Sequence, residues 1–189
     1  TLPADDDDRV SPAAARQPLP PLRLRLPTDQ DFGRLPDIVS LTVRALAGAA
    51  PALAQVGAPF TLAAFVTDPA APAHPERLRG LLYAEPAAWA ELAEVTTAVA
   101  IRSAQLQVDA GAQAVHVYDT WAGGLDEDVY RRHVLPWSKQ VFDAVAALRV
   151  PAIHYALRGG HLLEAMAEAG GEVIGIDWRG APHRAPDRP

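Results

Sequence analysis

The sequence of 189 residues contains no cysteine. This absence excludes disulfide bonds, thiolate zinc sites, iron–sulfur clusters and cysteine nucleophiles. Basic residues are scarce as well, because 17 Lys and Arg stand against 23 Asp and Glu, for a formal net charge of -6. Since binding to phosphate needs clustered Lys and Arg, this balance argues against a nucleic-acid partner.

Long apolar runs are also missing, and none approaches the ~20 residues that span a bilayer. The first residues, TLPADDDDRV, are acidic and lack an apolar signal core. We therefore expect a cytoplasmic protein without a membrane partner. Hydrophobic types make up 49% and charged types 21%, which is typical of a globular chain.

The two ends differ in composition from the rest of the chain. Residues 1–27 combine the acidic run Asp5–Asp8 with repeated prolines, and residues 181–189 are similarly rich in Pro and Arg. Such stretches bury little apolar surface and rarely form helix or sheet. The composition predicts disordered tails over 1–27 and 181–189 and one folded region over 28–180.

Four short apolar runs, each bounded by Gly or Pro, predict strands. They are Leu53–Ala58, Ala114–Asp119, Val150–Tyr155 and Glu172–Asp177. Because the runs are apolar throughout, we expect them to be buried on both faces of a parallel sheet. His116 and His154 lie inside two of them and are expected to be hydrogen-bonded core residues.

Helical patterns precede and separate these strands. Helices are expected over Thr28–Leu46 with Thr28 as N-cap, from Pro86, from Asp126, and over His161–Ala169. Trp89 follows helical spacing and is expected in the core, and Pro136 is expected to kink or break its helix. The alternating order implies parallel strands with right-handed crossovers. An open doubly wound sheet and part of a (β/α)₈ barrel both fit, and both bind ligands at the carboxyl ends of the strands.

Several motifs at these strand ends carry a resemblance to a known family. GAPFTLAAF (57–65), DAGAQAVHVYDTWAG (109–123), LPWS (135–138) and EVIGIDWR (172–179) resemble, in order and spacing, the motifs of uroporphyrinogen decarboxylases. The resemblance runs from about Thr28 to Arg179. It implies an α/β fold that is a partial (β/α)₈ TIM barrel, with about four parallel strands corresponding to family strands four to seven.

The resemblance also implies an activity. The family removes CO₂ from the acetate side chains of uroporphyrinogen III, giving coproporphyrinogen III in haem biosynthesis. It uses no cofactor and no metal, and it forms homodimers. For this chain the resemblance implies a tetrapyrrole substrate and a homodimer or a complementing chain. The family's Arg-rich first strand, its pyrrole-binding Asp and its final His loop have no counterpart here, so no catalytic residue is identified.

Three substrate-binding candidates fall inside the matched region. Phe65 stands where the family has Tyr, and it keeps the ring without the hydroxyl. Thr120 stands where the family has Ser, and it keeps a hydroxyl that can donate to a substrate carboxylate or cap its own turn. Arg158, in the stretch LRGGH, is suited to an anion near a helix start, and Arg179 is a similar case. Asp119 is expected to be structural.

Two alternative functions remain open from the sequence. A half-barrel exposes sheet edges and apolar faces, which favours a non-catalytic interaction module. The cobalamin-linked methyltransferases share the barrel but hold zinc with Cys and His. A chain without cysteine cannot build that site in its usual form.

Overall fold

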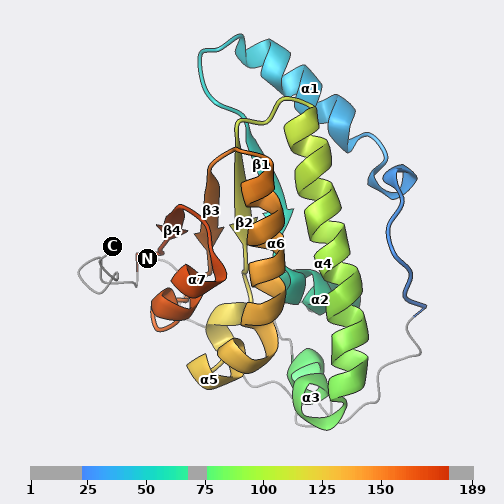
Figure 1. The fold of residues 1–189 in the computed structure, drawn as a ribbon, viewed down its shortest axis with the longest axis vertical. Coiled ribbons are helices and arrows are strands. Elements are labelled where there is room, and N and C mark those ends of the chain that lie inside the picture. Colours follow the sequence, from blue (N-terminus) through green and yellow to red (C-terminus); the bar gives the residue numbers. More distant parts are fainter. Residues whose placement is uncertain (1–22, 68–75, 179–189) are drawn as a thin grey trace, which may run out of the picture.

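The computed structural model describes residues 23–67 and 76–178, and its centre is a four-stranded parallel sheet (Figure 1). The strands lie side by side in chain order: β1 (Leu53–Gly57), β2 (Ala114–Tyr118), β3 (Ala152–Tyr155) and β4 (Val173–Gly175). All four predicted strands are therefore confirmed, although each is shorter than expected and the last two most so.

Seven α-helices accompany the sheet in the described residues. They are α1 (Leu35–Leu46), α2 (Pro59–Thr67), α3 (Glu76–Ala84), α4 (Pro86–Asp109), α5 (Glu127–Val129), α6 (Leu135–Ala147) and α7 (Leu163–Ala169). Figure 1 shows α4, α6 and α7 along the same face of the sheet. Sequential strands with crossover helices on one face form an arc of a barrel, whereas a doubly wound sheet has helices on both faces. The predicted partial barrel is confirmed.

The segment expected to form one helix from Thr28 is divided. It begins with the 3₁₀ turn η2 (Asp29–Phe32) and continues as α1 only at Leu35. Thr28 caps η2 as expected, since its backbone N–H donates to Asp31 Oδ2 at 2.7 Å. Gly33 ends the turn with a φ of 52°, a left-handed conformation that suits glycine. The predicted cap is confirmed and the continuous helix is wrong.

Helix α2 was not expected from the sequence. Most of its residues are buried, and its apolar side chains surround the helix instead of following one stripe. A helix that is apolar all round has no 3.6-residue signature. For this reason the strand end after β1 reads as a loop in the sequence, although it is the first turn of a helix.

The helical segment after Asp126 changes its hydrogen bonding before Pro136. Helix α5 leads into the π turn η4 (Tyr130–Val134), and α6 follows with Pro136 in its first turn. A proline is tolerated there because the backbone N–H groups of a first turn lack intrahelical partners. The expected break is confirmed, and it takes the form of a π turn, a feature that is frequent near functional sites.

The two faces of the sheet differ in burial. Val56, Val115 and Val117 point to the helical side and are 0–1% exposed. Leu53 and Val173 point to the other side and are 40% and 50% exposed. The expectation of burial on both faces is therefore wrong. Right-handed crossovers place the helices on one side, and four strands cannot close into a barrel that would cover the other.

The two strand histidines lie on different faces of the sheet and differ in burial. His154 is fully buried, and its Nδ1 lies 3.2 Å from the carbonyl oxygen of Met166, so it is the expected core residue. His116 lies on the open face, with its Nδ1 3.2 Å from Gln55 Oε1, so the prediction of a core position is wrong. Trp89 is 3% exposed and belongs to the core, as expected.

The predicted tails lie mostly outside the described residues, which begin at residue 23 and end at residue 178. Leu24, inside the predicted first tail, packs against the core, and Arg25 pairs with Asp31. The domain boundaries remain predictions. Among the described helices, none combines the length and the apolar character needed to cross a bilayer.

A matched pair of substitutions tests the one-sided burial of the sheet. Val117→Ala removes two methyl groups from a fully buried site, and we expect it to lower the free energy of unfolding by about 2 kcal/mol. Val173→Ala removes the same groups from the open face and should change it by less than about 0.5 kcal/mol. Urea denaturation measures both, and equal losses would contradict the open face.

Candidate functional site

The carboxyl ends of the four strands meet at one edge of the sheet, and a side-chain hydrogen bond forms their first junction. The Thr61 hydroxyl donates to Asp119 Oδ1 at 2.8 Å, and both residues are fully buried. Thr61 lies in the first turn of α2 after β1, while Asp119 directly follows β2. The bond therefore joins the ends of β1 and β2 through residues 58 positions apart.

The second junction joins the ends of β2 and β3. The backbone N–H of Asp119 donates to the carbonyl oxygen of Tyr155 at 2.7 Å. A few residues later, Gly123 lies so close to the next loop that a Cβ atom on it would overlap the carbonyl oxygen of Leu157. Only glycine allows this approach, so the turn 120–124 is packed directly against the loop after β3.

The third junction joins the ends of β3 and β4. The backbone N–H of Arg158 donates to Asp177 Oδ2 at 3.0 Å. Arg158 has a φ of 59°, and its side chain is exposed. We call the four joined strand ends the rim, which comprises residues 58–61, 119–124, 156–158 and 176–178. The contacts show that these segments are joined to one another in series.

The turn after Asp119 is also held from outside the sheet. The Arg79 guanidinium, from α3, donates to the carbonyl oxygen of Gly124. The ring Nε2 of His161 lies 2.8 Å from the carbonyl oxygen of Leu125. Thr120 is partly exposed at the start of this turn, and its hydroxyl has no hydrogen bond within the described residues. The hydroxyl is therefore available to a ligand and does not cap its own turn.

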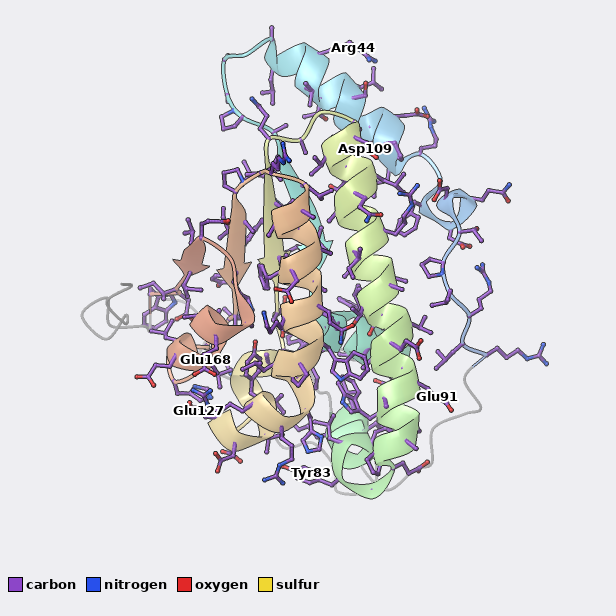
Figure 2. The ribbon with its side chains drawn as sticks, viewed as in Figure 1. Arg44, Tyr83, Glu91, Asp109, Glu127 and Glu168 are labelled. Carbon is purple, nitrogen blue, oxygen red and sulfur yellow. The ribbon has the colours of Figure 1, made fainter. Side chains whose placement is uncertain are left out.

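An ion-pair cluster ties the helices below the rim together. Arg131, in η4, pairs with Glu127 at 2.8 Å and with Glu168 of α7 at 2.6 Å. Figure 2 shows the two glutamates next to each other at the lower side of the molecule. The hydrogen bonds to both carboxylates raise the pKa of Arg131. These bonds hold η4, which carries Tyr130, against α7.

Two tyrosines on the open face were missed by the sequence reasoning. Strand pairing aligns Gly57, Tyr118, Tyr155 and Gly175 in one row, the last before the rim. Both tyrosines are partly exposed, and the His116 ring lies 5.7 Å and 5.9 Å from their ring centres. Only the register of the sheet reveals this row, because each tyrosine alone is simply a residue at the end of an apolar run.

The three predicted binding residues lie at the same end of the sheet. Thr120 and Arg158 are part of the rim. Phe65 lies in α2 one turn after Thr61, on the same side of the helix, and is 48% exposed. Their role in substrate binding remains a prediction. Arg179 lies outside the described residues.

Asp119 is electrostatically unusual. Burial raises the pKa of Asp119 to about 7, against the opposing effect of the hydrogen bond from Thr61. Its second carboxyl oxygen, Oδ2, is buried and has no hydrogen-bond partner within the described residues. Burial, and then the Asp119 charge, raise the pKa of Tyr130. Asp119 is therefore suited to change its protonation state near neutral pH.

His154 is another buried titratable group, and it faces the helical side of the sheet. Burial lowers the pKa of His154 to about 4. Its ring packs against Phe142 with ring centres 4.5 Å apart. The imidazole is therefore uncharged at neutral pH and belongs to the packing between the sheet and the helices.

A groove at the other end of the sheet differs in character from the rim. A groove of about 500 Å³ lies between α1 and the start of β1, at the end of the sheet opposite the rim, and its lining is mostly apolar. Among residues 23–67 and 76–178, no group of three His, Asp or Glu side chains is placed to hold a metal ion. The rim instead offers a hydroxyl, a guanidinium and tyrosine rings, which suit a ligand that is both anionic and aromatic.

Comparison with known proteins agrees with the motifs at the rim. Residues 9–187 match the family described as Uroporphyrinogen decarboxylase (URO-D). The chain belongs to this family. The match covers all four strands and every segment of the rim.

Relatives from several bacteria support the same family. A uroporphyrinogen decarboxylase of Nocardia farcinica is 43% identical over 150 residues, which are 79% of this chain and 42% of that protein. Those of Streptomyces coelicolor and Carboxydothermus hydrogenoformans are both 39% identical over 157 residues, covering 83% of this chain and 44% and 45% of theirs. The chain spans less than half the length of these curated relatives.

The raised pKa of Asp119 predicts how stability depends on pH. The folded state keeps its proton up to about pH 7, whereas an unfolded Asp loses it near pH 4. The free energy of unfolding should therefore fall as pH rises between these values, by roughly 1 kcal/mol per pH unit. The lowered pKa of His154 makes the free energy of unfolding rise with pH over part of this range. The contribution of Asp119 must therefore be measured as the difference in stability between the wild type and a variant.

Asp119→Asn isolates the contribution of the carboxyl. We expect the variant to gain stability relative to the wild type as pH rises from about 4 to 7, with a constant difference above pH 7. Urea denaturation at a series of pH values measures this difference. A difference that does not vary with pH would show that the carboxyl titrates in the folded state as it does in water.

Proposed function

We propose that this chain forms part of the barrel of a uroporphyrinogen decarboxylase and binds uroporphyrinogen along its rim. The observation that carries the proposal is the joined rim, which places the Thr120 hydroxyl and the Arg158 guanidinium at the same end of the sheet. Tyr118 and Tyr155 line the open face immediately below it. Membership of the family supports the choice of substrate.

The proposed chemistry needs no cofactor. When a pyrrole of the substrate is protonated at a ring carbon, it accepts the electron pair of the breaking bond between the acetate methylene and its carboxylate. CO₂ leaves, a proton is then added at the methylene carbon to form a methyl group, and the pyrrole loses the ring proton. The protein supplies orientation, charge complementarity and proton transfer.

Each candidate residue has a role in holding the substrate. The Thr120 hydroxyl donates to a substrate carboxylate, and the Arg158 guanidinium pairs with another. The Phe65 ring packs against the macrocycle. It lacks the hydroxyl of the family's Tyr, a loss of roughly 1.5–3 kcal/mol if that hydroxyl bonds a carboxylate. The tyrosine rings of the open face offer further aromatic contact.

The proposed activity requires the Arg-rich strand, the pyrrole-binding Asp and the His loop of the family, which a second copy of this sequence does not supply. The open face of the sheet is where the strands that carry them would lie. At the outer edge of β1, the Gln107 amide donates to and accepts from the backbone of Gln55, each at 3.0 Å. A strand added there must replace these two hydrogen bonds. The proposed setting is haem biosynthesis in the cytoplasm, with a homodimer as the assembled form.

A non-catalytic interaction module is the second candidate. It is favoured by the exposure of Leu53 and Val173 on the open face, which offers apolar surface to any partner. Such a module would need no tetrapyrrole site at the rim. Binding of a polycarboxylate porphyrin at the rim therefore separates the two candidates.

A binding experiment tests the rim with uroporphyrin, the stable oxidised analogue of the substrate. We expect the fluorescence of Trp residues to be quenched on binding, and Arg158→Ala to weaken binding about tenfold through loss of an ion pair. Arg149→Ala is the matched control, because Arg149 is also exposed and has the same φ of 59° but precedes β3 at the opposite end of the sheet. Equal effects of the two substitutions would contradict a site at the rim.

An activity experiment tests the complementation. The chain is co-expressed with those segments of the Nocardia farcinica relative that do not align with it. The resulting complex is then supplied with uroporphyrinogen. We expect coproporphyrinogen from the complex and none from the chain alone, because the catalytic charges come from the added segments. A stable complex without product would favour the interaction module.

A further inference from the structure

Three buried polar atoms beneath the rim have no hydrogen-bond partner within the described residues. They are Asp119 Oδ2, the Tyr130 hydroxyl and the Ser138 hydroxyl, and all three residues are fully buried. They come from the end of β2, from the π turn η4 and from α6. Buried polar atoms are nearly always hydrogen-bonded in folded proteins, so three in one neighbourhood indicate a site with a specific role.

Tyr130 lies close enough to the other two groups for each of them to influence its titration. The Asp119 charge raises the pKa of Tyr130, and the Ser138 hydroxyl lowers it. A protonated Asp119 carries one O–H donor. An ionised Asp119 cannot donate, and it leaves a charge in a buried site with only Thr61 as a side-chain donor.

The carboxyl is directly coupled to the turn that carries Thr120. Asp119 precedes Thr120 in the chain, its N–H is bonded to Tyr155 and its carbonyl oxygen accepts from the Ala122 N–H at 3.3 Å. The side chain and both backbone groups of Asp119 are thus engaged in separate contacts. The carboxyl and the turn are therefore linked through one residue.

We propose that Asp119 is a positioning residue, held by the hydrogen bond from Thr61 and by its own backbone hydrogen bonds, which fixes the orientation of Thr120 toward a substrate carboxylate. The proposal rests on the proposed function for the identity of the ligand. Asp119 itself does not touch the substrate. It acts through the turn 120–124 and, by way of Thr61, through the first turn of α2.

The groups around Asp119 and its turn determine which titrations can change the turn with pH. Thr61 donates to the carboxyl and carries no charge, and the pKa of Tyr130, which the Asp119 charge raises, keeps that hydroxyl uncharged near neutral pH. The turn itself is contacted by two groups that carry or can gain a positive charge, Arg79 at Gly124 and His161 at Leu125. Protonation of His161 is therefore the alternative source of any pH effect on this turn, and the test must separate it from Asp119.

The first measurement is the affinity of the intact chain for uroporphyrin between about pH 5.5 and 8.5. In the wild type we expect affinity to fall about tenfold as pH rises through the titration of Asp119. Asp119→Asn should bind as tightly as the low-pH wild type throughout, because its amide keeps one acceptor for Thr61 and one permanent donor. Asp109→Asn is the matched control. Asp109 is the last residue of α4 and lies at the end of that helix next to α1 (Figure 2), so this variant should keep the wild-type profile.

The hydrogen bond from Thr61 is tested by a second pair of variants. Thr61→Val keeps the shape of the side chain and removes the donor, so we expect about tenfold weaker binding at every pH. Thr61→Ser restores the hydroxyl and should restore most of the affinity. His161→Gln keeps a donor without a titration and should retain the pH profile of the wild type.

The second measurement needs no ligand. The amide chemical shifts of residues 120–124 should follow the titration of Asp119 in the wild type and in Asp109→Asn, and they should not change with pH in Asp119→Asn. Parallel pH profiles for the wild type and Asp119→Asn in both measurements would overturn the proposal. So would wild-type affinity in Thr61→Val. If no variant binds uroporphyrin but the shifts behave as described, the proposed ligand is wrong and the positioning of the turn stands.

Discussion

The hydrogen bond between Thr61 and Asp119 is the contact on which the rest of the rim depends. Both groups are fully buried, and the bond is 2.8 Å long. It fixes α2 against the end of β2, and the backbone of the same Asp119 continues the connection to β3. Because one residue supplies both connections, the ends of β1, β2 and β3 are placed together. Arg158 and Asp177 extend the connection to β4.

The one-sided sheet follows from chain topology and gives the rim its setting. Parallel strands need crossovers, and crossovers of one hand in sequential strand order place α4, α6 and α7 on the same face. The opposite face then carries the row of Tyr118 and Tyr155, open to whatever completes the barrel. The same topology therefore produces an apolar interior on one side and a partly polar, aromatic surface next to the rim on the other.

Much of the architecture could be predicted from the sequence, for identifiable reasons. Short apolar runs between helical patterns located all four strands, and the serial motifs located the family. Pro136 marked the break before α6. These features are local, so neighbouring residues are sufficient to reveal them. The resemblance added the candidates Phe65, Thr120 and Arg158, whose positions at one end of the sheet the structure confirms.

The remaining features depend on contacts between distant residues. The open face cannot be recognised in strands that are apolar throughout, because the number of strands and the side of the helices decide it. Helix α2 lacks a periodic stripe, since its apolar side chains surround the helix. The bond from Thr61 to Asp119 joins residues 58 positions apart, and the tyrosine row requires the strand register. Sequence alone therefore identified Asp119 as structural without showing what it holds together.

Native-state hydrogen exchange tests most directly whether the four strand ends form one cooperative unit. The amide groups of Ala58, Asp119 and Arg158 donate across the first, second and third junctions of the rim. If the rim is one unit, the three amides should open with the same free energy and should lose protection together when Thr61 is changed to Val. Three unrelated opening free energies, with only Ala58 responding to that change, would contradict the account.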